Sequence, residues 1–63
     1  MTVKEQKHYK QQGFPEKIIN ETIKFLQDNN YTLFNLARIT KDEYRVMFRN
    51  TKGKVDAMIF QIS

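Results

Sequence analysis

The chain has 63 residues, a net charge of +4 at pH 7 and no cysteine. A chain this short forms one domain and buries only about 60 % of its unfolded surface. Without cysteine it has no disulfide or zinc thiolate, and with His8 as its one imidazole we expect no metal site and no cofactor. The chain has no membrane-length apolar run and no secretory signal pattern, which predicts a cytoplasmic protein that does not enter a membrane.

The first element in chain order is a basic N-terminal arm or short helix at residues 1–13. Thr2 and Glu5 have the spacing of a capping box, and Gly13 suits a C-terminal cap. Within residues 2–12, Val3 and Tyr9 are the only apolar residues, and they lie about 120° apart on a helical wheel. Because no apolar stripe results, we expect a fraying helix or a disordered arm.

The second element is an amphipathic helix at residues 15–28. Pro15 fits the first helical turn, where its missing N–H costs nothing. One arc of roughly 160° holds the apolar side chains and a threonine: Ile18, Ile19, Thr22, Ile23, Phe25 and Leu26. Asn29 and Asn30 would fall on that arc, so we expect the helix to end there, with an asparagine in the left-handed conformation.

Three strands follow, at residues 34–40, 43–49 and 55–62. The segment at 43–49 alternates, the last segment is rich in β formers, and the first is the weakest of the three. Residues 50–53 have the pattern of a type I turn, with Gly53 at the position that needs a positive φ. The sequence therefore predicts an α+β fold, in which residues 14–63 form a single domain with the helix packed on a three-stranded antiparallel meander (α-β-β-β).

The turn lengths predict which side chains share a face of this sheet. Pairing of Asn50 with Lys54 and of Thr40 with Glu43 gives a face that the helix covers: Ala37, Ile39, Tyr44, Val46, Phe48, Met58, Phe60 and Ile62. The opposite face then comprises Leu36, Arg38, Thr40, Glu43, Arg45, Met47, Arg49, Val55, Ala57, Ile59 and Gln61. A free antiparallel face usually alternates to polar residues, whereas this one has an apolar band flanked by arginines.

The second face is therefore the candidate partner-binding surface, with Leu36, Arg38, Arg45, Met47, Arg49 and Ile59 as its central residues. The register places Arg38 opposite Arg45, where a bridging anion would relieve the repulsion between the two guanidinium groups. Turn lysines are candidates for phosphate or backbone contact: Lys41, Lys52 and Lys54. Two alternatives are arginine stems that cover apolar surface without any partner, and packing of the patch in a homodimer.

The residues assemble no catalytic set, and we expect that the protein is not an enzyme. His8 has no acid or nucleophile placed to orient it, and the only serine is Ser63. Asp42 and Glu43 are adjacent, so on a strand their carboxylates would point to opposite faces. No catalytic residue is therefore predicted.

Residues 38–54 carry six basic residues against two acidic ones, a net charge of +4. This block favours an acidic macromolecule as partner, either DNA or RNA or an acidic protein surface. We expect a small binding or regulatory protein that contacts nucleic acid through the basic sheet face. The alternative is a protein-binding inhibitor of a host enzyme or of a defence or regulatory factor, because methionine, isoleucine and arginine suit the centre of a protein interface.

The order of one helix and three strands over residues 15–62 resembles the first four elements of a double-stranded-RNA-binding domain. It is also similar to the HicA-type toxins built on that plan. The chain has no closing helix after Ile62 and no glycine–serine–histidine segment, so the resemblance covers topology alone and implies neither activity. The Lys-, Asn- and Ile-rich composition resembles that of small phage and mobile-element proteins from AT-rich bacteria.

Overall fold

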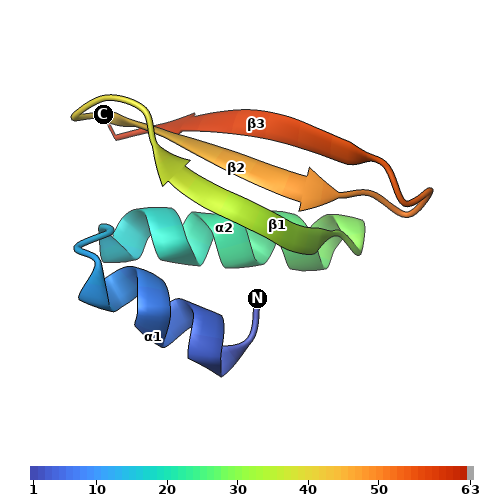
Figure 1. The fold of residues 1–63 in the computed structure, drawn as a ribbon, viewed down its shortest axis with the longest axis horizontal. Coiled ribbons are helices and arrows are strands. Elements are labelled where there is room, and N and C mark those ends of the chain that lie inside the picture. The colour runs from blue at the N-terminus through green and yellow to red at the C-terminus, as the bar shows by residue number, and fades with distance from the viewer. Residues whose placement is uncertain (63) are drawn as a thin grey trace.

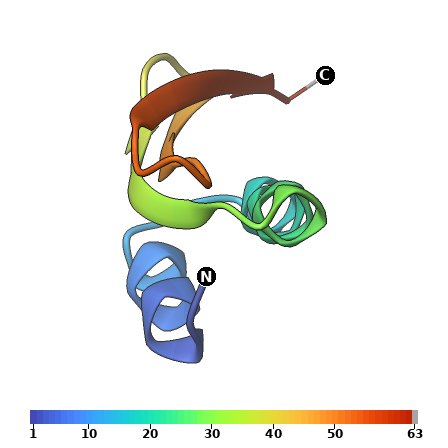
Figure 2. The same ribbon diagram turned by 90° about the vertical axis from the view of Figure 1, so that its right-hand side faces the viewer.

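The computed structural model describes residues 1–62. Its elements are α1 (Val3–Gln11), α2 (Glu16–Asn29), β1 (Thr32–Arg38), β2 (Glu43–Arg49) and β3 (Val55–Gln61). The strands form one antiparallel sheet in the order β1-β2-β3, so the α+β fold is as expected. The sheet curves around α2, which lies on its concave side, while α1 lies below α2 and β1 (Figures 1 and 2). Neither helix in the described range is long and apolar enough to cross a bilayer.

The N-terminal segment forms the short helix α1, and its capping box is present. The Thr2 hydroxyl accepts a hydrogen bond from the Glu5 N–H at 3.1 Å, and the Thr2 N–H donates to the Glu5 carboxylate at 2.9 Å. No residue of α1 is buried. Its half-buried Tyr9 ring lies 5.2 Å from the Phe14 ring, which lies 5.6 Å from Tyr44. This line of aromatic rings joins α1 to the core.

The helix α2 covers the sheet with the apolar arc that the sequence predicted. Ile18, Ile19, Thr22 and Leu26 are its buried residues. Asn30 ends the helix in the left-handed conformation, with φ 57° and ψ 39°. This confirms the predicted end of the helix. Asparagine tolerates the left-handed conformation better than most residues do.

The hairpin of β2 and β3 has the predicted register. Tyr44 pairs with Phe60, and the turn is closed by a 2.8 Å hydrogen bond from the Asn50 N–H to the Lys54 carbonyl oxygen. The Asn50 side chain accepts two further backbone hydrogen bonds within the turn. Gly53 has a φ of 81°, as the turn type requires. The parity of β2 and β3, and hence the identity of their two faces, is confirmed.

The predicted register of β1 is wrong by one residue. The Ile39 N–H donates to the Glu43 carbonyl oxygen at 2.9 Å, so the turn holds three residues, Thr40 to Asp42, in place of the expected two. Leu36 consequently pairs with Val46, and its side chain is only 3 % exposed. Burying leucine in place of Ala37 removes more apolar surface from water, which is the physical reason for this register.

The shift reverses the expected facing of the other β1 residues as well. Arg38 pairs with Tyr44, and its Nε donates to the Thr40 carbonyl oxygen at 3.3 Å. Ala37 pairs with Arg45 on the face away from α2, and Ile39 is exposed. The prediction that Ala37 and Ile39 lie under the helix is therefore wrong, because the turn after β1 is one residue longer than expected.

A β-bulge at Phe34 interrupts the alternation of β1. Leu33 pairs with Phe48, but Asn35 pairs with Met47, so Phe34 is an extra residue on this strand. The bulge lets Leu33 and Leu36, three residues apart, both face α2. It also places the Phe34 ring on the opposite side of the sheet, beside Arg49.

The core lies between α2 and the concave face of β1 and β2. Its buried cluster consists of Ile18, Leu26, Leu36, Tyr44, Val46 and Phe48. The strand β3 contributes the half-buried Phe60 to the rim of this cluster. The convex face of the sheet is left uncovered by both helices, and this face carries the candidate site (Figure 2).

Candidate functional site

The outer face of the sheet, which is the convex face away from α2, presents three rows of neighbours that extend across all three strands. The central strand β2 contributes Arg45, Met47 and Arg49 to it. Their partners on β1 are Ala37, Asn35 and Thr32, with Phe34 at the bulge; their partners on β3 are Ile59, Ala57 and Val55. Each side chain of the patch thus has a neighbour on an adjacent strand, and the rows form one continuous surface.

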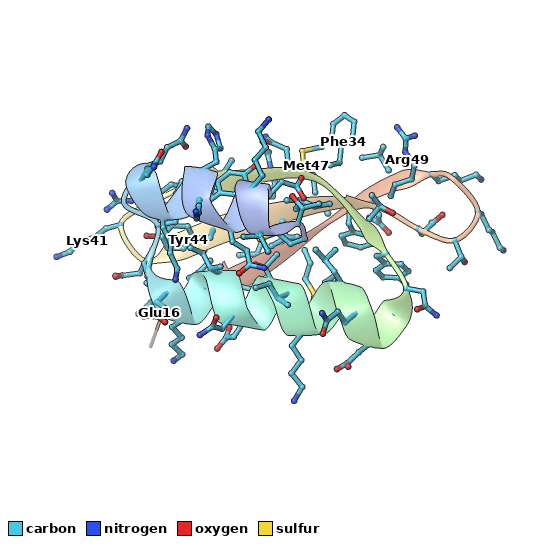
Figure 3. All side chains as sticks on the ribbon, turned by 90° about the horizontal axis from the view of Figure 1, so that it is seen from below. Glu16, Phe34, Lys41, Tyr44, Met47 and Arg49 are labelled. Atoms are coloured by element: carbon cyan, nitrogen blue, oxygen red, sulfur yellow. The ribbon has the colours of Figure 1, made fainter. Side chains whose placement is uncertain are left out.

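Much of this outer face is apolar and open to solvent. Phe34 is 55 % exposed, Ile59 48 % and Val55 44 %, and Met47 lies half-buried between the strands that carry them. Figure 3 shows Phe34, Met47 and Arg49 on the side of the molecule away from α2. Isolated exposed apolar residues are ordinary, whereas a group of them on one sheet face is typical of a contact surface.

The two arginines of the outer face differ in their surroundings. The Arg49 guanidinium lies 6.0 Å from the centre of the Phe34 ring, within reach of a cation–π interaction. Arg45 lies between Ala37 and Ile59, and its Nε is buried without a hydrogen-bond partner among residues 1–62. A buried donor without a partner costs free energy, and the side chains around Nε limit the positions open to the guanidinium group.

Glu43 is the one acidic residue of the outer face, and its carboxylate is engaged by neutral donors. One of its oxygens accepts from the Thr40 hydroxyl at 3.1 Å, and the other accepts from the Gln61 amide at 3.2 Å. Both bonds hold the carboxylate at the end of the sheet where β2 begins and β3 ends. The positive charge of Arg45 and Arg49 is therefore available to an external group.

The structure brings together four of the six predicted partner-binding residues: Arg45, Met47, Arg49 and Ile59. The other two do not belong to the outer face. Leu36 is a core residue, and Arg38 lies opposite Tyr44. The expected pairing of Arg38 with Arg45 is absent, so the argument for an anion bridging these two residues no longer holds.

Sequence reasoning missed Phe34 as a residue of this face. A signal for it was present, because Leu33 and Leu36 are three positions apart and cannot share one face of a regular strand. Only a bulge between them buries both, and the extra residue then turns outward. Phe34 supplies the one aromatic ring of the outer face.

The three predicted turn lysines lie at opposite ends of the sheet. Lys41 belongs to the turn between β1 and β2, whereas Lys52 and Lys54 belong to the turn between β2 and β3. Figure 3 shows Lys41 at the end of the molecule away from Arg49. Lys52 and Lys54 therefore extend the positive charge of the outer face at the Arg49 end, and Lys41 does so at the other.

The remaining polar chemistry of residues 1–62 is sparse. His8 lies in α1 and shares a 3.0 Å hydrogen bond with Gln12. The described residues contain no group of three His, Asp or Glu that could hold a metal ion, and they form no pocket. Comparisons of the chain with protein-family models, with curated proteins and with solved structures found no match.

Proposed function

We propose that this chain is a non-enzymatic binding protein whose outer face docks on an acidic surface of another protein and thereby regulates or inhibits it. The observation that supports this proposal is the apolar patch of exposed Phe34, Val55 and Ile59 around the half-buried Met47, with Arg45 and Arg49 set into it. Apolar side chains supply the burial that drives association, and the guanidinium groups select a partner with carboxylates.

The distribution of residue types favours a protein partner over nucleic acid. Interface centres are enriched in aromatic residues, methionine and arginine, and depleted in lysine. The outer face has this composition, and the lysines lie in the turns at its ends, where a polar rim is expected. Because Arg38 does not belong to the outer face, this face carries two arginines, fewer than the sequence alone suggested. Phe34 adds apolar area to it.

The proposal is tested with the double variant Arg45→Glu with Arg49→Glu. The matched control, Lys4→Glu with Lys7→Glu, makes the same change in net charge on exposed positions of α1. In pull-downs from a host lysate, the wild-type chain and the control should retain one stoichiometric protein, and the outer-face variant should lose it. Equal retention by both variants, or loss with both, would remove the outer face as the binding site.

The apolar part of the surface is tested separately with Phe34→Ala and Ile59→Ala. A protein interface centred on these side chains should weaken by at least about tenfold with each, since truncating a central anchor costs more than about 1.4 kcal/mol. A partner whose affinity falls when the arginines are replaced, but is unchanged by Phe34→Ala and by Ile59→Ala, would contradict a protein interface of this kind.

One observation favours nucleic acid as a second candidate partner. Arg49 lies over the exposed Phe34 ring, and Lys52 and Lys54 follow in the adjacent turn. An exposed ring beside basic groups is a stacking platform for an unpaired base, with phosphates held by the lysines. Electrophoretic-shift assays with single-stranded DNA and RNA test it: binding should fall steeply with salt and weaken with Phe34→Leu. Absence of binding at low salt removes this candidate.

A further inference from the structure

The strand β3 is the most exposed of the three strands. Six of its seven residues are exposed, and only Phe60 is half-buried. Met58 faces the concave side but is still 42 % exposed, because α2 covers β1 and β2 and leaves β3 at the margin. Figure 1 shows β3 as the strand farthest from both helices.

The hydrogen-bond phase of the hairpin shows which backbone groups of β3 are free. Asn50 bonds to Lys54 and Ile62 bonds to Asp42, so the even-numbered positions of the ladder are its hydrogen-bonded pairs. In an antiparallel ladder the alternate residues direct their N–H and C=O groups away from the partner strand. The free edge of β3 therefore consists of the backbone groups of Val55, Ala57, Ile59 and Gln61.

The free edge of β3 has few of the features that prevent an edge strand from pairing with another chain. The strand VDAMIFQ has no proline, glycine or lysine, and its one charged residue is Asp56. The Asp56 carboxylate accepts a hydrogen bond from the adjacent Ala57 N–H at 2.8 Å. In the isolated chain the Asp56 carboxylate thus occupies the Ala57 N–H, which is one of the free donors of the edge. A backbone carbonyl of a paired strand can replace this contact.

We propose that β3 pairs in antiparallel fashion with β3 of a second copy of this chain, about a two-fold axis at Met58. Strand bounds Val55 and Gln61 lie at equal distances from Met58, so this axis gives the longest overlap, with all seven residues paired. Ala57 of one copy then exchanges hydrogen bonds with Ile59 of the other. Two three-stranded sheets become one six-stranded sheet, which carries both outer faces on the same side.

The side chains agree with this register. Asp56 of one copy lies opposite Phe60 of the other, so no like charges face each other across the axis. An axis at Asp56 would set the two carboxylates directly opposite and would also shorten the overlap. At the chosen axis the two Met58 side chains meet on the concave side, where α2 leaves them exposed.

The small area of the proposed contact between the two β3 strands limits the affinity of the dimer. A stable interface takes about 800 Å² from each partner, and a single edge strand supplies less than this. The isolated chain exposes 4523 Å², and only the margin formed by β3 is used. We therefore expect a weak dimer, with a dissociation constant on the order of 100 µM, that forms at high local concentration.

The first test uses the absence of cysteine from the chain. In the proposed dimer the two residues 58 form a non-hydrogen-bonded pair about 4.5 Å apart at Cα, within the range of a disulfide. Met58→Cys should therefore give a disulfide-linked dimer under mild oxidation. The matched control is Asp56→Cys, whose two copies would lie about 14 Å apart along the strands and should crosslink at least tenfold more slowly. Equal rates, or faster crosslinking of the control, would overturn the two-fold axis at Met58.

The second test removes the edge donor without touching the ladder to β2. Ala57→Pro deletes an N–H that points away from β2, a place where proline is tolerated on an edge strand. Sedimentation between about 10 µM and 1 mM should show the wild-type mass rising toward that of a dimer while the variant stays monomeric. If Ala57→Pro fails to fold by circular dichroism, the N-methylated Ala57 backbone, made by chemical synthesis, replaces it. A wild-type mass that stays monomeric throughout, or a variant that still dimerises, would refute the pairing.

Discussion

The strands β2 and β3 have seven residues each, pair residue for residue, and nevertheless differ in almost every structural property. In β2, Tyr44, Val46 and Phe48 are buried, and the residues between them form the centre of the outer face. In β3, the same alternation leaves both faces exposed. The difference follows from position: β2 has a strand on each side and α2 beneath it, whereas β3 has one neighbour and contacts the core mainly through Phe60.

This comparison teaches that the core of so small a domain is concentrated under β1 and β2, while β3 keeps a free edge. A 63-residue chain has core enough for one covered region, and the structure places that region under β1 and β2. The strand β3 is held mainly by its ladder to β2. It is therefore the element that can change partners, or bind new ones, with the least loss of stability.

The largest expected effect comes from truncating paired residues of the two strands. Val46 is fully buried and pairs with the exposed Met58. We expect Val46→Ala to lower the free energy of unfolding by about 2 kcal/mol, because it removes buried methyl groups and leaves a cavity. Met58→Ala should cost about 0.5 kcal/mol despite removing more atoms. Urea denaturation at low protein concentration measures both values, and comparable losses would show that β3 belongs to the core.

A smaller effect is expected inside the covered region, and it has the opposite sign. Thr22 is fully buried on α2, and its hydroxyl has no hydrogen-bond partner among residues 1–62. Thr22→Val keeps the shape and removes the unsatisfied group, so we expect a gain of about 1 kcal/mol in thermal or urea unfolding. Thr32→Val, at an exposed position of β1, is the matched control and should change stability by less than about 0.5 kcal/mol. Destabilisation by Thr22→Val would indicate that the hydroxyl makes a bond in solution.

The smallest effect should come from the periphery at the other side of the molecule. Thr2→Ala removes the capping box of α1, which is worth about 1 kcal/mol to the helix itself. Because α1 buries no residue, we expect the global free energy of unfolding to fall by only about 0.5 kcal/mol. Amide hydrogen exchange should accelerate in α1 and stay unchanged in α2. Faster exchange throughout the chain would mean that α1 is required for the core.

The hairpin of β2 and β3 was predictable because its determinants are local. The alternation of Tyr44, Val46 and Phe48 sets the parity, and the turn from Asn50 to Gly53 joins the strands without ambiguity. The end of α2 was predictable for the same reason, since Asn30 lies where the apolar arc stops. The capping box indicated α1, but its attachment through Tyr9 and Phe14 joins separate elements and was not foreseen.

The register of β1 was not predictable from its turn. Residues 40–42 can form a two-residue or a three-residue turn, and only the competition between Leu36 and Ala37 for the core decides between them. The same error put Leu36 and Arg38 in the predicted binding site. The residues of β2 and β3 in that site, Arg45, Met47, Arg49 and Ile59, were placed correctly because their hairpin was.

The bulge in β1 has a consequence for how this protein can vary. Phe34 is the residue that the ladder skips, so its side chain can be exchanged without moving any neighbour from one side of the sheet to the other. Deleting the residue would leave a regular strand in which Leu33, Asn35 and Leu36 pair in unbroken register with β2, so both leucines would still face the interior. Substitution at this single position, or its loss, can therefore change the outer face while Leu33 and Leu36 stay in the interior.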